Sequence, residues 1–179
     1  MTATARRYLV VIGETVAATA VCSAGPEPVG ANADPSIAPL DGFTLRHLPD
    51  RLGPIVSDVD YEWDDVSFRT RVWERGPDAE SGYHVDLTAA VLRGERLTDP
   101  DALRDFLADY LDHDPQQWPL QRYDRNSCHG FATSGFATSE RVFFLFRPGV
   151  AVQVVADEGN VVTPDELIAI ADGIEPADS

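Results

Sequence analysis

Two segments near the middle of the chain alternate between apolar and polar residues, and this pattern restricts the fold more than any other feature of the sequence. The first is VSFRTRVWE at 66–74 and the second is YHVDLTAAVLRG at 83–94, with the polar loop RGPDAESG between them. A period of two is typical of a strand that buries one face. The pair therefore predicts an antiparallel hairpin, in which Arg71 and Asp86 are expected to oppose one another as a surface ion pair.

The period changes after the second strand, where apolar residues recur at helical spacing in TDPDALRDFLADYLDHD. This pattern predicts an amphipathic helix over 99–112, capped by Thr98 or Asp99. Its apolar stripe needs a buried partner, so Phe106 and Tyr110 are expected to face the sheet. The strand face that they contact is expected to be the one that carries Val85, Leu87 and Val91.

A second helix is predicted at the end of the chain, in TPDELIAIADGI, where Thr163 and Glu166 form a capping box. Between the two helices, PLQRYD, RVFFLF and VAVQVVAD read as further strands. Strands followed by a helix, more strands and a closing helix are typical of an α+β fold. We expect one domain over 43–176, an antiparallel sheet of about five to seven strands with two amphipathic helices packed on it.

The N-terminal segment has the composition of an export signal. A basic start, MTATARR, precedes the apolar run YLVVIGETVAATAVCSAG, and Ala31-Asn32-Ala33 matches a small-x-small cleavage site. Residues 1–33 are therefore expected to be a signal peptide and 34–42 a linker, which places the protein outside the cell or in the cell envelope. The alternative is that YLVVIG is a strand of the fold and the protein is cytoplasmic.

The charge balance limits the partners that the protein can have. The chain has 30 acidic residues against 14 basic ones, all arginine, and a net charge of -16. Such a field repels nucleic acid, so a protein or a neutral small molecule is the expected partner. The apolar N-terminal run is too short and interrupted to span a membrane. The sequence does not specify an oligomeric state.

The stretch NSCHGFATSGFATSERVFFLFRPG invites a catalytic interpretation, because Cys128 precedes His129. Neighbouring residues on a strand point to opposite faces, so these two side chains are not expected to form a nucleophile and base. The glycines lack the pattern of a phosphate-binding loop, and no cofactor is expected. Instead, the stretch predicts strands with Phe131 and Phe136 in the core and a tight turn at 148–149. If Cys22 leaves with the signal peptide, Cys128 remains a lone thiol.

Carboxylates gather in SDVDYEWDD, where four of them share one face of an extended segment. They are Asp58, Asp60, Glu62 and Asp64. Such oxygen ligands suit calcium, but the segment lacks the glycine and glutamate of an EF-hand loop. The favoured interpretation is a solvated strand face that discourages edge-to-edge association, and no metal is expected.

Two further sets of residues remain as candidates for a site. His84 and Asp86 share a strand face, which makes them candidates for an acid–base pair. Aromatic residues could line a cup for a small, cofactor-free enzyme of the isomerase or cyclase type, or for a binding protein. The aromatic candidates are Trp63, Trp73, Tyr83, Phe144 and Phe146.

Three segments carry a resemblance: RVWERG, VDLTAAVLRGERLTDPDALRDFLADY, and RPGVAVQV followed by TPDELIAIADGI. They resemble uncharacterised secreted proteins of actinobacteria, and the closing strand, turn and helix resemble Mog1/PsbP-like α+β domains. The second resemblance implies an accessory or binding module without catalysis. That function is the expectation, and the small pocket enzyme is the alternative. No functional residue transfers from either resemblance.

Overall fold

The structure is a computed structural model that describes residues 38–78, 82–126, 132–157 and 161–177. The expected signal peptide, the first part of the expected linker, both cysteines and Phe131 lie outside these ranges. From Leu40, whose side chain is buried, the chain already belongs to the core. No helix in the described part of the chain has the length and apolar character needed to cross a membrane.

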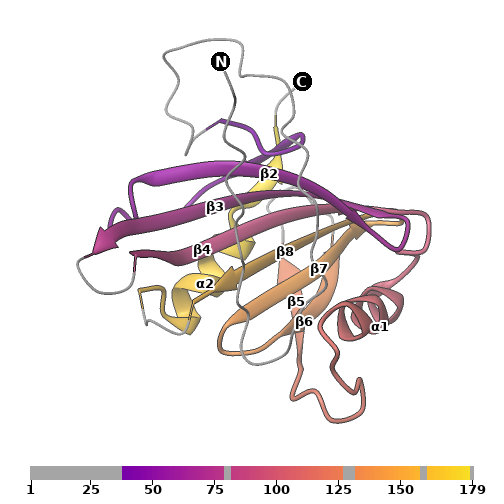
Figure 1. Ribbon diagram of the computed structural model, residues 1–179. Helices are drawn as coiled ribbons and strands as arrows, with labels where there is room; N and C mark the ends of the chain where they lie inside the picture. The colour runs from indigo at the N-terminus through magenta and orange to yellow at the C-terminus, as the bar shows by residue number, and fades with distance from the viewer. Residues whose placement is uncertain (1–37, 79–81, 127–131, 158–160, 178–179) are drawn as a thin grey trace.

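The described residues form nine strands and two helices (Figure 1). In order they are β1 (Phe43–Leu45), β2 (Ile55–Trp63), β3 (Val66–Asp78), β4 (Gly82–Arg93), α1 (Pro100–Tyr110), β5 (Gln121–Asn126), β6 (Ala132–Ala137), β7 (Arg141–Arg147), β8 (Val150–Ala156), α2 (Pro164–Asp172) and β9 (Ile174–Pro176).

Seven of the strands form one antiparallel sheet in the order β2-β3-β4-β8-β7-β6-β5. The α+β class is therefore confirmed, and so are the predicted hairpin, β3 with β4, and the turn at 148–149 between β7 and β8. The remaining strands, β1 and β9, pair with each other as a separate ribbon. No sequence pattern indicated β9, because a strand of three residues is too short to show a period.

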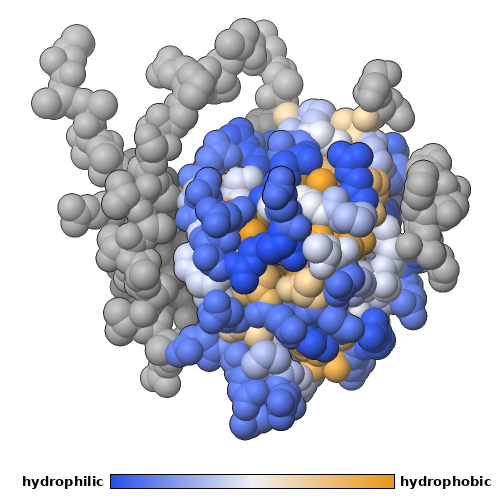
Figure 2. Space-filling model, turned by 90° about the vertical axis from the view of Figure 1, so that its right-hand side faces the viewer, coloured by the Kyte–Doolittle hydropathy of each residue, from blue (hydrophilic) through white to orange (hydrophobic). Residues whose placement is uncertain are grey.

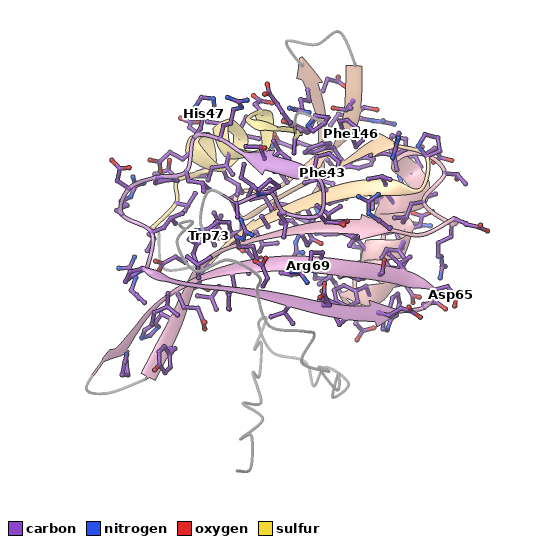
Figure 3. The ribbon with its side chains drawn as sticks, turned by 90° about the horizontal axis from the view of Figure 1, so that it is seen from above. Phe43, His47, Asp65, Arg69, Trp73 and Phe146 are labelled. Carbon is purple, nitrogen blue, oxygen red and sulfur yellow. The ribbon has the colours of Figure 1, made fainter. Side chains whose placement is uncertain are left out.

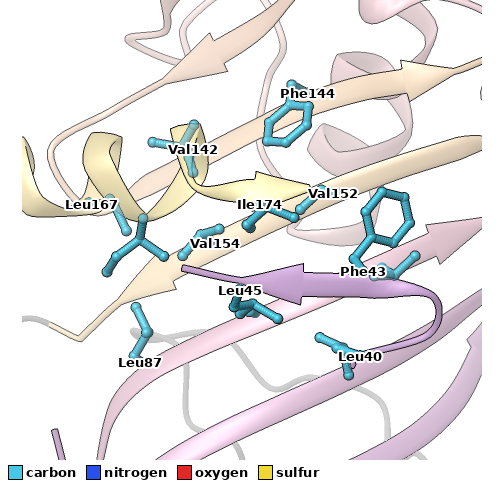
Figure 4. Close-up of a cluster of buried hydrophobic side chains, with 14 of the residues drawn as sticks. Leu40, Phe43, Leu45, Leu87, Val142, Phe144, Val152, Val154, Leu167 and Ile174 are labelled. Atoms are coloured by element: carbon cyan, nitrogen blue, oxygen red, sulfur yellow. The ribbon is translucent and has the colours of Figure 1, made fainter. Parts of the chain in front are cut away.

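Both faces of the large sheet are covered, by different elements. One face, with Leu87, Val91 and Val154, packs against α2 and the β1–β9 ribbon (Figure 4). The other face, with Phe68 and Leu92, packs against α1. The sheet is thus the middle of three layers, which explains why so many of its residues are apolar on both sides.

The contact predicted for the first helix is wrong in its choice of face. Phe106 is buried against Trp63 and Phe68, with ring centroids 5.3 and 6.0 Å away. The predicted partners Leu87 and Val91 belong to the core on the opposite side of the sheet. Alternation places residues on two faces, but it does not tell which face a helix will cover.

Local sequence signals determine where both helices begin. The Asp99 carboxylate accepts a hydrogen bond from the Ala102 N–H at the start of α1. At the start of α2, the Thr163 hydroxyl and the Glu166 carboxylate form the predicted capping box. Both helices also begin with proline, which suits the first turn.

Candidate functional site

A hollow of about 720 Å³ lies on the ribbon side of the sheet, over the hairpin of β2 and β3. Figure 3 shows this side, with Arg69 and Trp73 along the hairpin and Asp65 at its tip. The cations of the hollow already have partners: Arg69 pairs with Asp60, and Arg93 pairs with Asp41. Because both of its arginines already have carboxylate partners, the hollow offers no free cation to a ligand.

The acidic run serves the same network. Asp58, Asp60 and Glu62 alternate along β2 as predicted, whereas Asp64 lies in the following turn with a positive φ of 47°. Arg71 donates two hydrogen bonds to Asp58, at 2.7 and 2.9 Å. In the described residues, no three His, Cys, Asp or Glu side chains are grouped to hold a metal ion. The carboxylates of Asp58 and Asp60 act as partners of arginines.

Asp86 has a structural role. Its carboxylate is 2% exposed and accepts two hydrogen bonds from Arg75 and one from the Gly53 N–H, each at 2.7 Å. His84 is exposed on the same strand. The predicted pairing of Arg71 with Asp86 is wrong, because the regular register of β3 and β4 places Arg71 opposite Ala89.

The five aromatic candidates do not share one space. Trp63 packs against Phe106 under α1, whereas Trp73 and Phe144 belong to the core on the other face. Phe146 packs against that same core, with its ring edge-to-face with Phe43, whereas Tyr83 is 49% exposed on β4.

The face that carries α1 has a polar border that the sequence did not reveal. The strand register aligns five residues from five neighbouring strands in a single row across the sheet. This outer row consists of Ser57, Val72, Thr88, Val155 and Arg141. Its first four members are half-buried, and the row therefore forms a partly open floor beside the helix, ending at Arg141.

Between the outer row and the residues beneath α1 lies a row of mixed character, which includes Thr70 and Gln153. Both are buried, at 9% and 6% exposed. The Thr70 hydroxyl lies near Tyr61 but makes no hydrogen bond of normal geometry within the described part of the chain. Polar groups thus increase in number from the helix toward the outer row.

Arg141 is a charged residue of this face that is nevertheless buried. Its side chain is 8% exposed, and its guanidinium makes no ion pair or hydrogen bond within the described residues. Burial lowers the pKa of Arg141 to about 10, and the hydroxyls of Tyr110 and Tyr61 partly offset this effect. Glu140 acts on it as well, from beyond ion-pair distance. The guanidinium nitrogens retain some contact with solvent, because they are not among the fully buried polar atoms without a partner. A cation that is mostly buried and has no partner in the described part of the chain is nevertheless costly, so water or a bound anion is needed to balance it.

Two tyrosines on the α1 side of the sheet affect the pKa of this group. The hydroxyls of Tyr61 and Tyr110 are 3.1 Å apart and share a hydrogen bond. Burial raises the pKa of Tyr61, and its hydroxyl therefore stays protonated at neutral pH. Since a shared hydrogen bond uses one of the two protons, the other hydroxyl proton is available to an acceptor.

A buried acid on this side of the sheet, Glu74, is not paired with Arg141. Glu74 follows Val72 by two residues on β3, is 6% exposed, and has a pKa raised by burial. It lies on a strand three places from β7 in the sheet, and no ion pair joins it to Arg141.

Two other buried arginines differ from Arg141 because their guanidinium groups have acceptors within the protein. Arg71 and Arg125 are each 2% exposed. Arg71 binds Asp58, and Arg125 donates to the carbonyl oxygens of Asp172 and Ile174 at the end of α2. In this protein a buried arginine with a structural role has its donors occupied, and Arg141 does not follow that rule.

The surface seen in Figure 2 is mostly hydrophilic, with small apolar patches between charged residues. Comparison of the chain with protein-family models, with curated proteins and with solved structures found no match.

Proposed function

We propose that this protein is a binding module without catalysis, exported to the cell exterior or envelope, which holds a small ligand on the outer row beside α1. The observation that carries the proposal is the buried guanidinium of Arg141, which has no partner among the described side chains. A charge placed there for stability alone would resemble Arg71 or Arg125, whose partners are part of the fold. A ligand that supplies the missing partner accounts for the arrangement.

The floor of the outer row supports the same proposal. Val72 and Val155 offer half-buried apolar surface, and Ser57 and Thr88 offer hydroxyls. A few placed polar groups on an apolar floor are typical of small-ligand sites. Export is the part of the proposal that rests on the sequence, namely the basic start and the Ala31-Asn32-Ala33 site.

The alternative of a pocket enzyme has weaker support. It was expected to use an aromatic cup, and the five aromatic candidates lie on both faces of the sheet or on its far end. The Tyr61 hydroxyl, with its raised pKa, is also a poor base at neutral pH.

The proposal can be tested by screening the full chain against a library of small neutral and anionic fragments, followed by amide and methyl NMR shifts. We expect binding fragments to shift resonances of the outer row, such as those of Thr88 and Val155. A Thr88→Trp variant should abolish this binding by filling the floor, whereas Ser67→Trp on the opposite face should not.

Val155→Trp repeats the blockade on the neighbouring strand, in case Thr88→Trp does not fold. Native spectra of each variant establish that the fold is retained. If bound fragments gather elsewhere, or if the two blocking variants bind as well as the Ser67→Trp control, the proposed site is refuted.

A further inference from the structure

We infer that the group recognised at Arg141 is a carboxylate, attached to a short apolar body that lies along the outer row. This inference rests on the proposed function and adds the chemical class of the ligand. It depends on the shape and charge of the guanidinium, on the two tyrosine hydroxyls, and on the character of the neighbouring floor.

Charge restricts the ligand first. One guanidinium neutralises one negative charge, and Arg141 is 8% exposed, in surroundings where an unbalanced charge is costly. A dianion such as phosphate would leave a surplus negative charge in a chain whose net charge is already -16. A monoanion balances the site, whereas a neutral molecule leaves the cation uncompensated.

The geometry of the hydrogen-bond donors also restricts the ligand. The guanidinium is planar, with its donors arranged in a fork that matches the two oxygens of a carboxylate. The Tyr61–Tyr110 pair, which acts electrostatically on Arg141, has a hydroxyl proton that it does not use internally, because the two oxygens share a single hydrogen bond. The guanidinium and the tyrosine hydroxyl are both hydrogen-bond donors. Both therefore suit a carboxylate, which carries several lone pairs and no proton.

The floor then indicates what the carboxylate is attached to. Val155 neighbours Arg141 directly in the register, followed by Thr88 and Val72. These side chains are short and half-buried, so an extended apolar body can lie over them and remove apolar surface from water. A short-chain aliphatic acid has both parts.

The test compares butyrate with butyramide, which has nearly the same shape but no charge, by calorimetry and NMR on the full chain. We expect butyrate to bind about tenfold or more tightly than butyramide, as is usual for charge-assisted hydrogen bonds. Arg141→Met should remove that preference, and Arg141→Lys should restore it partly, because lysine keeps the charge but lacks the fork. Arg147→Met, at the exposed end of the same strand, changes the net charge equally and should leave butyrate binding unaltered.

The outcomes separate this inference from the proposed function. If butyramide binds as well as butyrate and both shift the outer row, the site stands but the carboxylate is refuted. Phosphate binding more tightly than butyrate at equal ionic strength would also refute it. If neither probe nor any fragment of the library shifts the outer row, both proposals fail.

Discussion

Replacing Arg141 by methionine is expected to stabilise the protein, although it removes the central group of the proposed site. Lowering the pKa of Arg141 from its ordinary value to about 10 corresponds to roughly 3 kcal/mol against the charged form in the folded state. Methionine removes this penalty and fills a similar space with apolar atoms. We therefore expect the free energy of unfolding to rise by about 1–3 kcal/mol, in line with other replacements of buried charges.

The pH dependence follows from the same cause. Because the pKa of Arg141 is lower in the folded state, the penalty for its charge is fully present below pH 10 and is lost as the pH rises from there toward the ordinary pKa of arginine. The gain from Arg141→Met should therefore be constant around neutral pH. It should shrink only in strongly alkaline solution.

Urea denaturation followed by tryptophan fluorescence, in buffer free of carboxylates, measures the change directly. Arg125→Met is the matched control, because Arg125 is equally enclosed but donates to the carbonyls of Asp172 and Ile174. That control should lose about 1–3 kcal/mol, since it leaves buried acceptors unsatisfied. A loss of more than about 1 kcal/mol in Arg141→Met would refute the reasoning, because it would mean that Arg141 has a stabilising partner in the folded protein.

Three further predictions concern stability, pH and processing. Phe106→Ala should cost about 3–5 kcal/mol, as for other large core aromatics, whereas the exposed Asp105→Ala on the same helix should change stability by less than about 0.5 kcal/mol; equal urea midpoints for the two would contradict the packing of α1. The hydrogen bond from Arg51, followed by those from Thr163, lowers the pKa of Glu166 to about 2, so the stability that it contributes is present above pH 4.5 and is lost as the pH falls through 2. Glu166→Gln should accordingly lower the Tm at neutral pH and have almost no effect near pH 2, and an equal difference at both values would count against this. Intact-mass spectrometry of protein from the native host should find a chain that starts at or near Asp34, and a cytoplasmic chain beginning at Met1 would overturn the export prediction.

Much of the fold follows from local patterns in the sequence. A period of two over 66–74 and 83–94 is sufficient for the hairpin, because each residue's face depends on its immediate neighbours. Helical spacing and capping residues such as Asp99 and Thr163 likewise act within one turn, so both helices begin where the sequence predicts. These features were predictable because their physical causes lie within a few residues of one another.

The contacts between elements were not predictable in this way. Both faces of β4 carry apolar residues, Leu92 on one and Leu87 on the other, so the alternation alone does not assign α1 to either. The register of the hairpin placed Arg71 opposite Ala89, and Asp86, beside a bulge, binds Arg75 instead. Register and bulges depend on the whole strand pairing, and no local signal announces them.

The candidate site belongs entirely to this second category. The sequence determined that Arg141 begins an apolar strand and that Ser57, Val72, Thr88 and Val155 alternate along four others. It is the order of strands in the sheet that sets these five residues in one row and leaves the guanidinium without a carboxylate in reach among the described residues. Burial and charge balance are properties of what surrounds a group in space, and here the surroundings come from strands far apart in the chain.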